Sequence, residues 1–102
     1  GAVVVSAAVG DLTVLSGADA LTSYRFNTGV AEHFFCSRCG IYTHHRRRSN
    51  PNQLGVNVSC LAGVSPFDFQ AVTVLDGVNH PADRPVAGDG VVGTLSYEPR
   101  TV

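Results

Sequence analysis

The sequence predicts a mainly β, antiparallel fold with short strands, long loops and little helix. Eleven glycines and five prolines divide the 102 residues into segments that are too short for long helices. Valine and threonine are abundant in those segments, and β-branched residues favour the pleated surface of a strand. In residues 54–60, apolar side chains alternate with Gly, Asn and Ser, which is typical of a half-buried strand. At this length, residues 1–102 are expected to form a single domain.

The predicted strands of the first half are separated by glycine-containing turns. They cover residues 2–8, 12–15, 21–26 and 30–36. Residues 18–21 are expected to form one helical turn. Asn27-Thr28-Gly29 is typical of the tight turn of a hairpin, so strands 21–26 and 30–36 should pair.

The second half continues the same pattern with longer connections. Its predicted strands cover residues 41–45, 54–60, 71–75 and 91–97. Residues 46–52 are polar and contain Pro51, which predicts a loop. Residues 76–89 contain several Gly and Pro residues and predict a long surface loop.

Composition and charge exclude several classes of protein. The formal net charge is −1, the pI is near 6.4, and 15% of the residues are charged, so no broad basic surface exists for nucleic acid or an acidic membrane. No apolar run approaches the roughly 20 residues of a membrane span. The first residues do not resemble a secretory signal peptide. Three cysteines, an odd number, then favour reduced thiols and a cytoplasmic location.

The segment Cys36-Ser37-Arg38-Cys39-Gly40 is the most informative part of the chain. Two thiolates separated by two residues bind one Zn²⁺ when the backbone between them folds into a tight knuckle, whose amides point back at the first sulfur. Gly40 suits the positive φ that this turn requires after the second cysteine. We therefore predict that Cys36 and Cys39 are zinc ligands. Two alternatives are a pair of structural thiols and a redox pair, although no helix is expected to follow the pair as redox motifs require.

A structural zinc site needs four ligands, and this pair supplies two. The other candidates are Cys60, His33, His44, His45 and His80. Cys60 is expected on the apolar face of strand 54–60, where a free cysteine packs like a small hydrophobic residue. His44 and His45 are adjacent, so a strand would point them to opposite faces and only one could approach the metal. The rest of the ligand set stays open.

Three consecutive arginines form the main concentration of charge. The candidate substrate-binding residues are Arg46, Arg47 and Arg48, together with the nearby His44, because guanidinium groups pair bidentately with the carboxylates of an anionic substrate. A solvated loop is the alternative, and we favour it because runs of charge usually face water. Residues 79–81, Asn-His-Pro, are candidates for placing a general base, but turn formation is the simpler interpretation.

Five short motifs follow one another between residues 10 and 83. They are LSG and YRF within 15–26, HFFCSRCG at 33–40, IYTHHRRRSNP at 41–51, GVNVSCL at 55–61 and DGVNHP at 76–81. Each motif is moderately specific by itself. In this order and spacing, the chain resembles the glutathione-dependent formaldehyde-activating enzyme family, which includes centromere protein V.

This resemblance implies a β-tent fold of antiparallel sheets with two zinc sites. It places Cys36 and Cys39 in a structural site with an upstream Cys-x-Cys pair, and it builds the catalytic site from a cysteine cluster upstream of the region that matches residues 1–5. Neither upstream motif lies within these residues, so the chain resembles the C-terminal two-thirds of such a domain. Family members are carbon–sulfur lyases that condense glutathione with formaldehyde to S-hydroxymethylglutathione. The implied cofactor is Zn²⁺, the implied partner is a small thiol such as glutathione, and no catalytic residue is assigned within the chain.

Other functions remain open alongside the lyase. A non-catalytic zinc-binding or interaction module would keep the fold without the catalytic zinc, and a thiol redox protein is a third interpretation. A homodimer is a further hypothesis, because two copies on a two-fold axis could each contribute Cys36 and Cys39 to one shared Zn²⁺.

Overall fold

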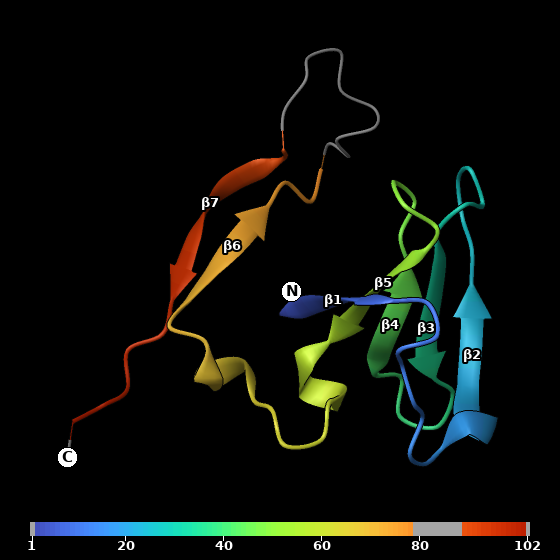
Figure 1. Ribbon diagram of the computed structural model, residues 1–102, viewed down its shortest axis with the longest axis horizontal. Helices are drawn as coiled ribbons and strands as arrows, with labels where there is room; N and C mark the ends of the chain where they lie inside the picture. Colours follow the sequence, from blue (N-terminus) through green and yellow to red (C-terminus); the bar gives the residue numbers. More distant parts are fainter. Residues whose placement is uncertain (1, 79–88, 102) are drawn as a thin grey trace. The chain divides into compact units, whose positions relative to one another are not determined.

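The computed structural model describes residues 2–78 and 89–101 and confirms a mainly β, antiparallel fold with short strands (Figure 1). The chain divides into two compact units, Gly1–Val64 and Ser65–Val102. The first unit contains a five-stranded sheet and the second a two-stranded sheet. Within the described residues, the only helical segments are three single turns of 3₁₀ helix, and no helix has the length and hydropathy of a membrane span.

The sheet of the first unit has the strand order β1-β5-β4-β3-β2, and all of its pairs are antiparallel. Its strands are β1 (Val4–Ala8), β2 (Leu21–Tyr24), β3 (Glu32–Cys36), β4 (Tyr42–Arg46) and β5 (Gln53–Asn57). Strands β2 to β5 follow one another as a meander, and β1 adds to the free edge of β5. The predicted hairpin turn is confirmed, since Gly29 N–H donates to Phe26 O over 3.0 Å and Asn27 has a φ of 54°.

The strand predicted for residues 12–15 is wrong. After β1, this segment forms no ladder and runs to a single 3₁₀ turn, η1 (Ala18–Ala20). Gly10 and Gly17 flank it with positive φ angles of 104° and 78°, which turn the chain out of the sheet at both ends. Leu15 keeps 79% of its surface exposed. The short apolar run therefore lies over a sheet face and does not extend the sheet edge.

Strand β5 lies between β1 and β4. Two predictions for this part of the chain, its half-buried character and its length, are wrong. Its last four residues are all buried, so it is not the half-buried strand that the alternating pattern predicted. It also ends at Asn57, because the Asn57 side chain accepts a hydrogen bond from Ser59 N–H (3.1 Å) and starts the 3₁₀ turn η2 (Val58–Cys60). Val58 becomes fully buried, whereas Cys60 is exposed and not packed on an apolar face as predicted.

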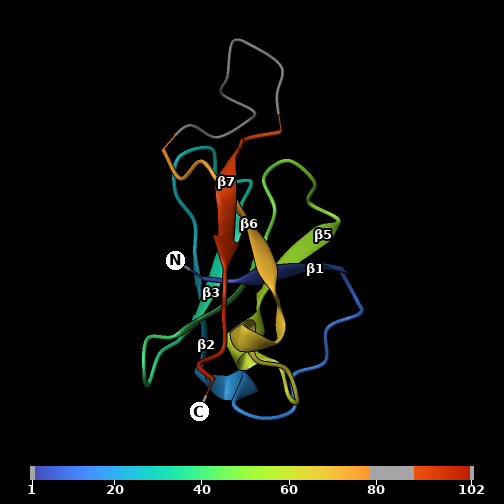
Figure 2. The same ribbon diagram turned by 90° about the vertical axis from the view of Figure 1, so that its left-hand side faces the viewer.

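The second unit is a hairpin preceded by a capped turn. The 3₁₀ turn η3 (Pro66–Asp68) begins with a capping box. The Asp68 carboxylate accepts a hydrogen bond from Ser65 N–H, and the Ser65 hydroxyl accepts one from Phe67 N–H. Strands β6 (Ala71–Leu75) and β7 (Val91–Ser96) pair antiparallel, close to the predicted bounds, and lie side by side in Figure 2. The long loop predicted between them falls mostly outside the described residues, as do Asn79, His80 and Pro81.

Candidate functional site

The cysteine pair forms a closed backbone turn at the end of β3. Cys36 N–H donates to Ile41 O over 2.9 Å, and Gly40 N–H donates to Cys36 O over 2.7 Å. Gly40 adopts a φ of 80°, the left-handed conformation predicted for it. Ser37 N–H donates to Ala20 O (2.8 Å), which ties the turn to η1. We call residues 36–40 the knuckle.

The surroundings of the Cys36 sulfur favour its thiolate form over the thiol. Backbone N–H groups of Cys39 and then Arg38 hydrogen-bond to it, and with the Cys39 thiol and the nearby Arg38 charge they hold the pKa of Cys36 below its ordinary value. This direction of the Cys36 pKa agrees with the prediction that the amides point back at this sulfur. Because thiolate is the form that binds zinc, the donor chemistry of Cys36 and Cys39 fits Zn²⁺.

The histidines proposed to complete the ligand set do not gather at the knuckle. In residues 2–78 and 89–101, no group of three or more His, Cys, Asp or Glu side chains lies close enough to hold a metal ion. His33, His44 and His45 lie within β3 and β4, each stacked on another ring. His80 lies outside the described residues. In the described part of the chain, the knuckle therefore offers two of the four ligands that a structural zinc site would need.

Cys60 is the thiol that comes nearest to joining the knuckle. Its Sγ donates to Tyr42 O over 3.6 Å, at the beginning of β4 and directly after the Ile41 carbonyl that Cys36 bonds. Burial raises the pKa of Cys60, and negative charge on Cys39 raises it further. Cys60 is therefore a neutral thiol at neutral pH, within electrostatic reach of the second knuckle cysteine.

His44 and His45 point to opposite faces of the sheet, as predicted, and His45 is packed on one of them. Its imidazole hydrogen-bonds Tyr42 Oη and stacks on His33 with 5.4 Å between ring centroids. The ring lies over Gly55, where an added Cβ would collide with it. Burial, followed by the charges of His33, Arg47 and His44, lowers the pKa of His45 to about 4.

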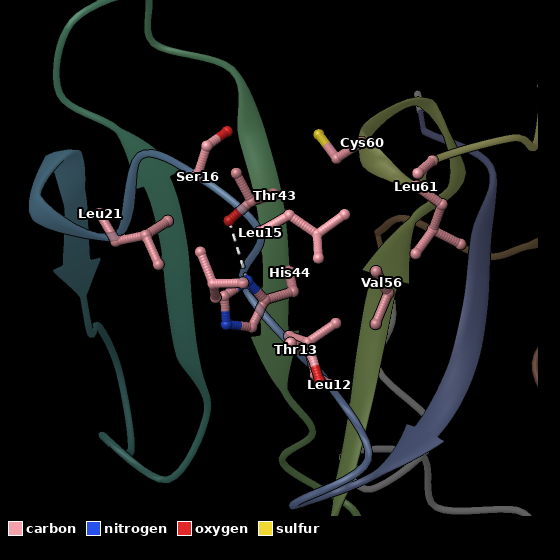
Figure 3. A pocket seen from close by; sticks show the side chains of 12 residues that line it. Leu12, Thr13, Leu15, Ser16, Leu21, Thr43, His44, Val56, Cys60 and Leu61 are labelled. Carbon is pink, nitrogen blue, oxygen red and sulfur yellow. Dashed lines mark hydrogen bonds between the residues drawn. The ribbon is translucent and has the colours of Figure 1, made fainter.

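On the other face, His44 stacks closely on Phe34, with ring centroids 4.4 Å apart and planes 9° from parallel. Its Nδ1 lies 2.9 Å from Thr43 Oγ1 (dashed line in Figure 3), and the same hydroxyl donates to Phe34 O over 3.2 Å. A hydroxyl has one hydrogen, and a carbonyl can only accept, so Thr43 must accept from Nδ1–H of His44. Nε2 of the neutral ring is then a lone-pair acceptor.

A cavity of about 600 Å³ opens beside the His44 ring, which is within the range of small-molecule sites (Figure 3). The segment 12–16 forms one wall, and the sheet together with residues 60–62 forms the others. The apolar side chains on these walls are Leu12, Val14, Leu15, Leu21, Val56, Leu61 and Ala62, and the polar ones are Thr13, Ser16, Thr43, His44 and Cys60. We call this cavity the His44 pocket. None of its side chains carries a permanent charge, and burial lowers the pKa of His44.

Arg47 and Arg48 lie in the predicted loop, whereas Arg46 does not. Arg46 is the last residue of β4, and all three side chains are half-buried. Arg47 Nη2 donates to Ser6 Oγ over 2.7 Å, reaching across β5 on the face of His45, whereas Arg46 is paired in register with Glu32 on the face of His44. Arg46 and Arg47 therefore cannot bind the same carboxylate. Substrate binding by Arg46, Arg47 or Arg48 stays a prediction.

One solved structure gives an independent comparison for this fold. The crystal structure of a Rhodobacter sphaeroides protein, a structural genomics target, is similar to this chain at 55% sequence identity and a TM-score of 0.59. The match covers 64% of this chain and 60% of that chain, so this chain spans less than two thirds of its relative's length. No family model matches the sequence.

The His44 pocket is the part of the site that the sequence did not predict. Residues 12–15 were assigned to a strand, so their side chains were not expected to face His44. The pocket also depends on an irregular register between Phe34 and Phe35, which lets both Thr43 and His44 line the same cavity. The sequence offered no specific signal for the pair Thr43-His44, because the rest of β4 (YTHHR) is rich in polar residues as well.

Proposed function

We propose that this chain is part of a zinc-binding carbon–sulfur lyase of the glutathione-dependent formaldehyde-activating type, acting in the cytoplasm. The observation that carries the proposal is the knuckle, where two backbone amides favour the thiolate of Cys36 beside Cys39. The ordered motifs across residues 10–83 support the same family. A thiol and a small aldehyde are the substrates, and glutathione and formaldehyde are the pair that the resemblance implies.

The proposed reaction is the addition of a thiol to a carbonyl. A sulfur–carbon bond forms, the C=O π bond breaks, and the proton that leaves the thiol ends on the carbonyl oxygen, so no oxidant or reductant is required. Cys36 and Cys39 would hold a structural Zn²⁺, and a zinc ion at a catalytic site would stabilise a thiolate or polarise a carbonyl. Within the chain, His44 Nε2 is an acceptor for a thiol proton in a cavity without charged side chains.

A non-catalytic zinc-binding module is the second candidate, favoured by one observation. The part of the chain that the structure describes groups only two ligands at the knuckle. Such a module could complete its zinc site with Cys36 and Cys39 of a second copy across a two-fold axis. A homodimer with one zinc per two chains is the expected signature of this alternative.

Product formation by the purified protein separates these two functions. Incubation with ¹³C-formaldehyde and a thiol is followed by NMR, which detects the S-hydroxymethyl carbon and its exchange with free aldehyde. The lyase predicts faster formation and exchange than in buffer containing the same zinc concentration. A rate equal to that control, in protein that binds zinc through Cys36 and Cys39, would leave the module as the function.

A further inference from the structure

We propose that the His44 pocket binds a small, neutral, mainly apolar molecule that donates one hydrogen bond to Nε2 of His44. Calling this donor the S–H group of the substrate thiol rests on the proposed function, whereas the binding itself does not. The inference gives the pocket a ligand class that differs from glutathione, which is a charged tripeptide.

The Thr43 hydroxyl determines which kind of hydrogen bond the pocket can make with a ligand. The Thr43 hydroxyl donates its only hydrogen to Phe34 O. The proton of neutral His44 therefore lies on Nδ1, and Nε2 has a lone pair that can accept a hydrogen bond. No partner for Nε2 lies among the described residues, and the atom is not sealed from solvent. A ligand with a donor group satisfies this acceptor, and a ligand with only acceptor atoms does not.

The walls of the pocket offer no counter-ion to an ionic ligand. Its walls contain no Asp, Glu, Lys or Arg, and the titratable groups in it, His44 and Cys60, are held in their neutral forms by burial. A carboxylate or ammonium entering the cavity would lose water without gaining a counter-ion, which is costly. Arg46 and Glu32 lie opposite each other in the register of β3 and β4 and do not line the pocket.

The walls supply the contacts for an apolar body. Leu12, Leu21 and Val56 line the cavity beside the His44 ring, and Leu15 stands over it with 79% of its surface still exposed. A ligand of four to six carbons would cover part of that surface, which is the source of affinity for a small apolar molecule. Cys60 adds a further polar group to the cavity wall, apart from the His44 ring (Figure 3), so the donor end of the ligand lies away from this thiol.

Titration of the protein with five probes, one of them glutathione, tests this inference, with NMR shifts of His44 and of the pocket leucines as the readout. Butane-1-thiol and butan-1-ol carry a donor, methyl butyl sulfide carries none, and 3-mercaptopropionate adds a charge. We expect saturable binding of the two donor probes, about fivefold weaker binding of the sulfide for the loss of one hydrogen bond, and no saturation by the carboxylate or by glutathione.

Two substitutions locate the binding and a third controls for it. His44→Phe keeps the stack on Phe34 but removes Nε2, so the fivefold difference between thiol and sulfide should disappear. Leu15→Asp places a carboxylate at an exposed position of the wall, which leaves folding intact, and it should abolish binding of all neutral probes. His33→Phe, on the opposite face, should change neither result.

Equal binding of the thiol and the sulfide, saturation by 3-mercaptopropionate, or shifts confined to the opposite face would each overturn the inference. Its failure is distinct from failure of the proposed function. If the protein forms S-hydroxymethylglutathione but the pocket binds no neutral donor, the lyase stands and this ligand class is wrong. If the pocket binds butane-1-thiol but no thiol yields product, the ligand class stands and the lyase is wrong.

Discussion

His44 and His45 are neighbours in the chain, yet their imidazoles have opposite surroundings. His45 is enclosed by Tyr42, His33 and Gly55, and its pKa falls to about 4. His44 rests one ring face on Phe34 and presents an unpaired nitrogen beside a 600 Å³ cavity. The face of His45 is packed with side chains of the sheet itself. On the face of His44, a cavity separates the sheet from residues 12–16.

The comparison teaches that strand alternation can give two adjacent and identical residues different functions. A ring packed like that of His45 stabilises the sheet. An imidazole with one nitrogen fixed by Thr43 and the other open is a positioned proton acceptor. We therefore assign chemistry to the His44 face and stability to the His45 face, and the predictions below separate the two.

Gly55→Ala is expected to have the largest effect on stability, because it places a methyl group within the packed face of the sheet. The new Cβ would collide with His45 Cε1 and lie 2.9 Å from Val4 Cγ1, and neither β1 nor β4 can move away without breaking its ladder. We expect a loss of about 2–3 kcal/mol in the free energy of unfolding, measured by urea denaturation. Gly93→Ala is the control, since nothing lies within 4 Å of its Cβ position. Equal small losses at both sites would mean that His45 is not packed against Gly55.

The fold and the knuckle could be predicted from sequence because both depend on local patterns. Glycine spacing, alternation and the turn at Asn27 set strands β2, β3 and β6, while Cys36, Cys39 and Gly40 define their own turn. The segment 12–16 could not be assigned, because a short apolar run suits either a strand or a covering segment. The exposure of Cys60 was also missed, because it depends on the Asn57 side chain ending β5 early.

Acidification is expected to destabilise the packed face by a smaller amount. His45 has a pKa of about 4 in the folded chain and about 6.5 in the unfolded chain, so the unfolded chain takes up the proton first as pH falls. Its contribution is complete above pH 6.5 and is lost progressively down to pH 4. We expect about 1–2 kcal/mol for this half-buried ring, after allowance for screening by solvent.

Urea denaturation at several pH values measures that slope, and His45→Phe tests its source. The substitution keeps an aromatic ring against His33 and removes the titrating group, so the loss of stability between pH 6.5 and 4 should become smaller. An unchanged slope in His45→Phe would assign the acid sensitivity to other groups, such as His44, whose pKa is also lowered by burial.

His44→Phe is expected to have the smallest effect on stability. The stack on Phe34 is preserved, and the main loss is one hydrogen bond to Thr43, worth about 1 kcal/mol or less. Urea denaturation at neutral pH measures the change. A loss above about 3 kcal/mol would mean that His44 is as structural as His45, and the distinction between the two faces would fail.

Native mass spectrometry of the purified protein tests the central claim, that Cys36 and Cys39 hold zinc, most directly. It reports zinc per chain and the number of chains in one spectrum. The account predicts bound zinc that is lost in Cys36→Ser and in Cys39→Ser but kept in Cys60→Ser, which removes a thiol outside the knuckle. Zinc that survives both knuckle substitutions, or its absence from the unmodified protein, would contradict the account.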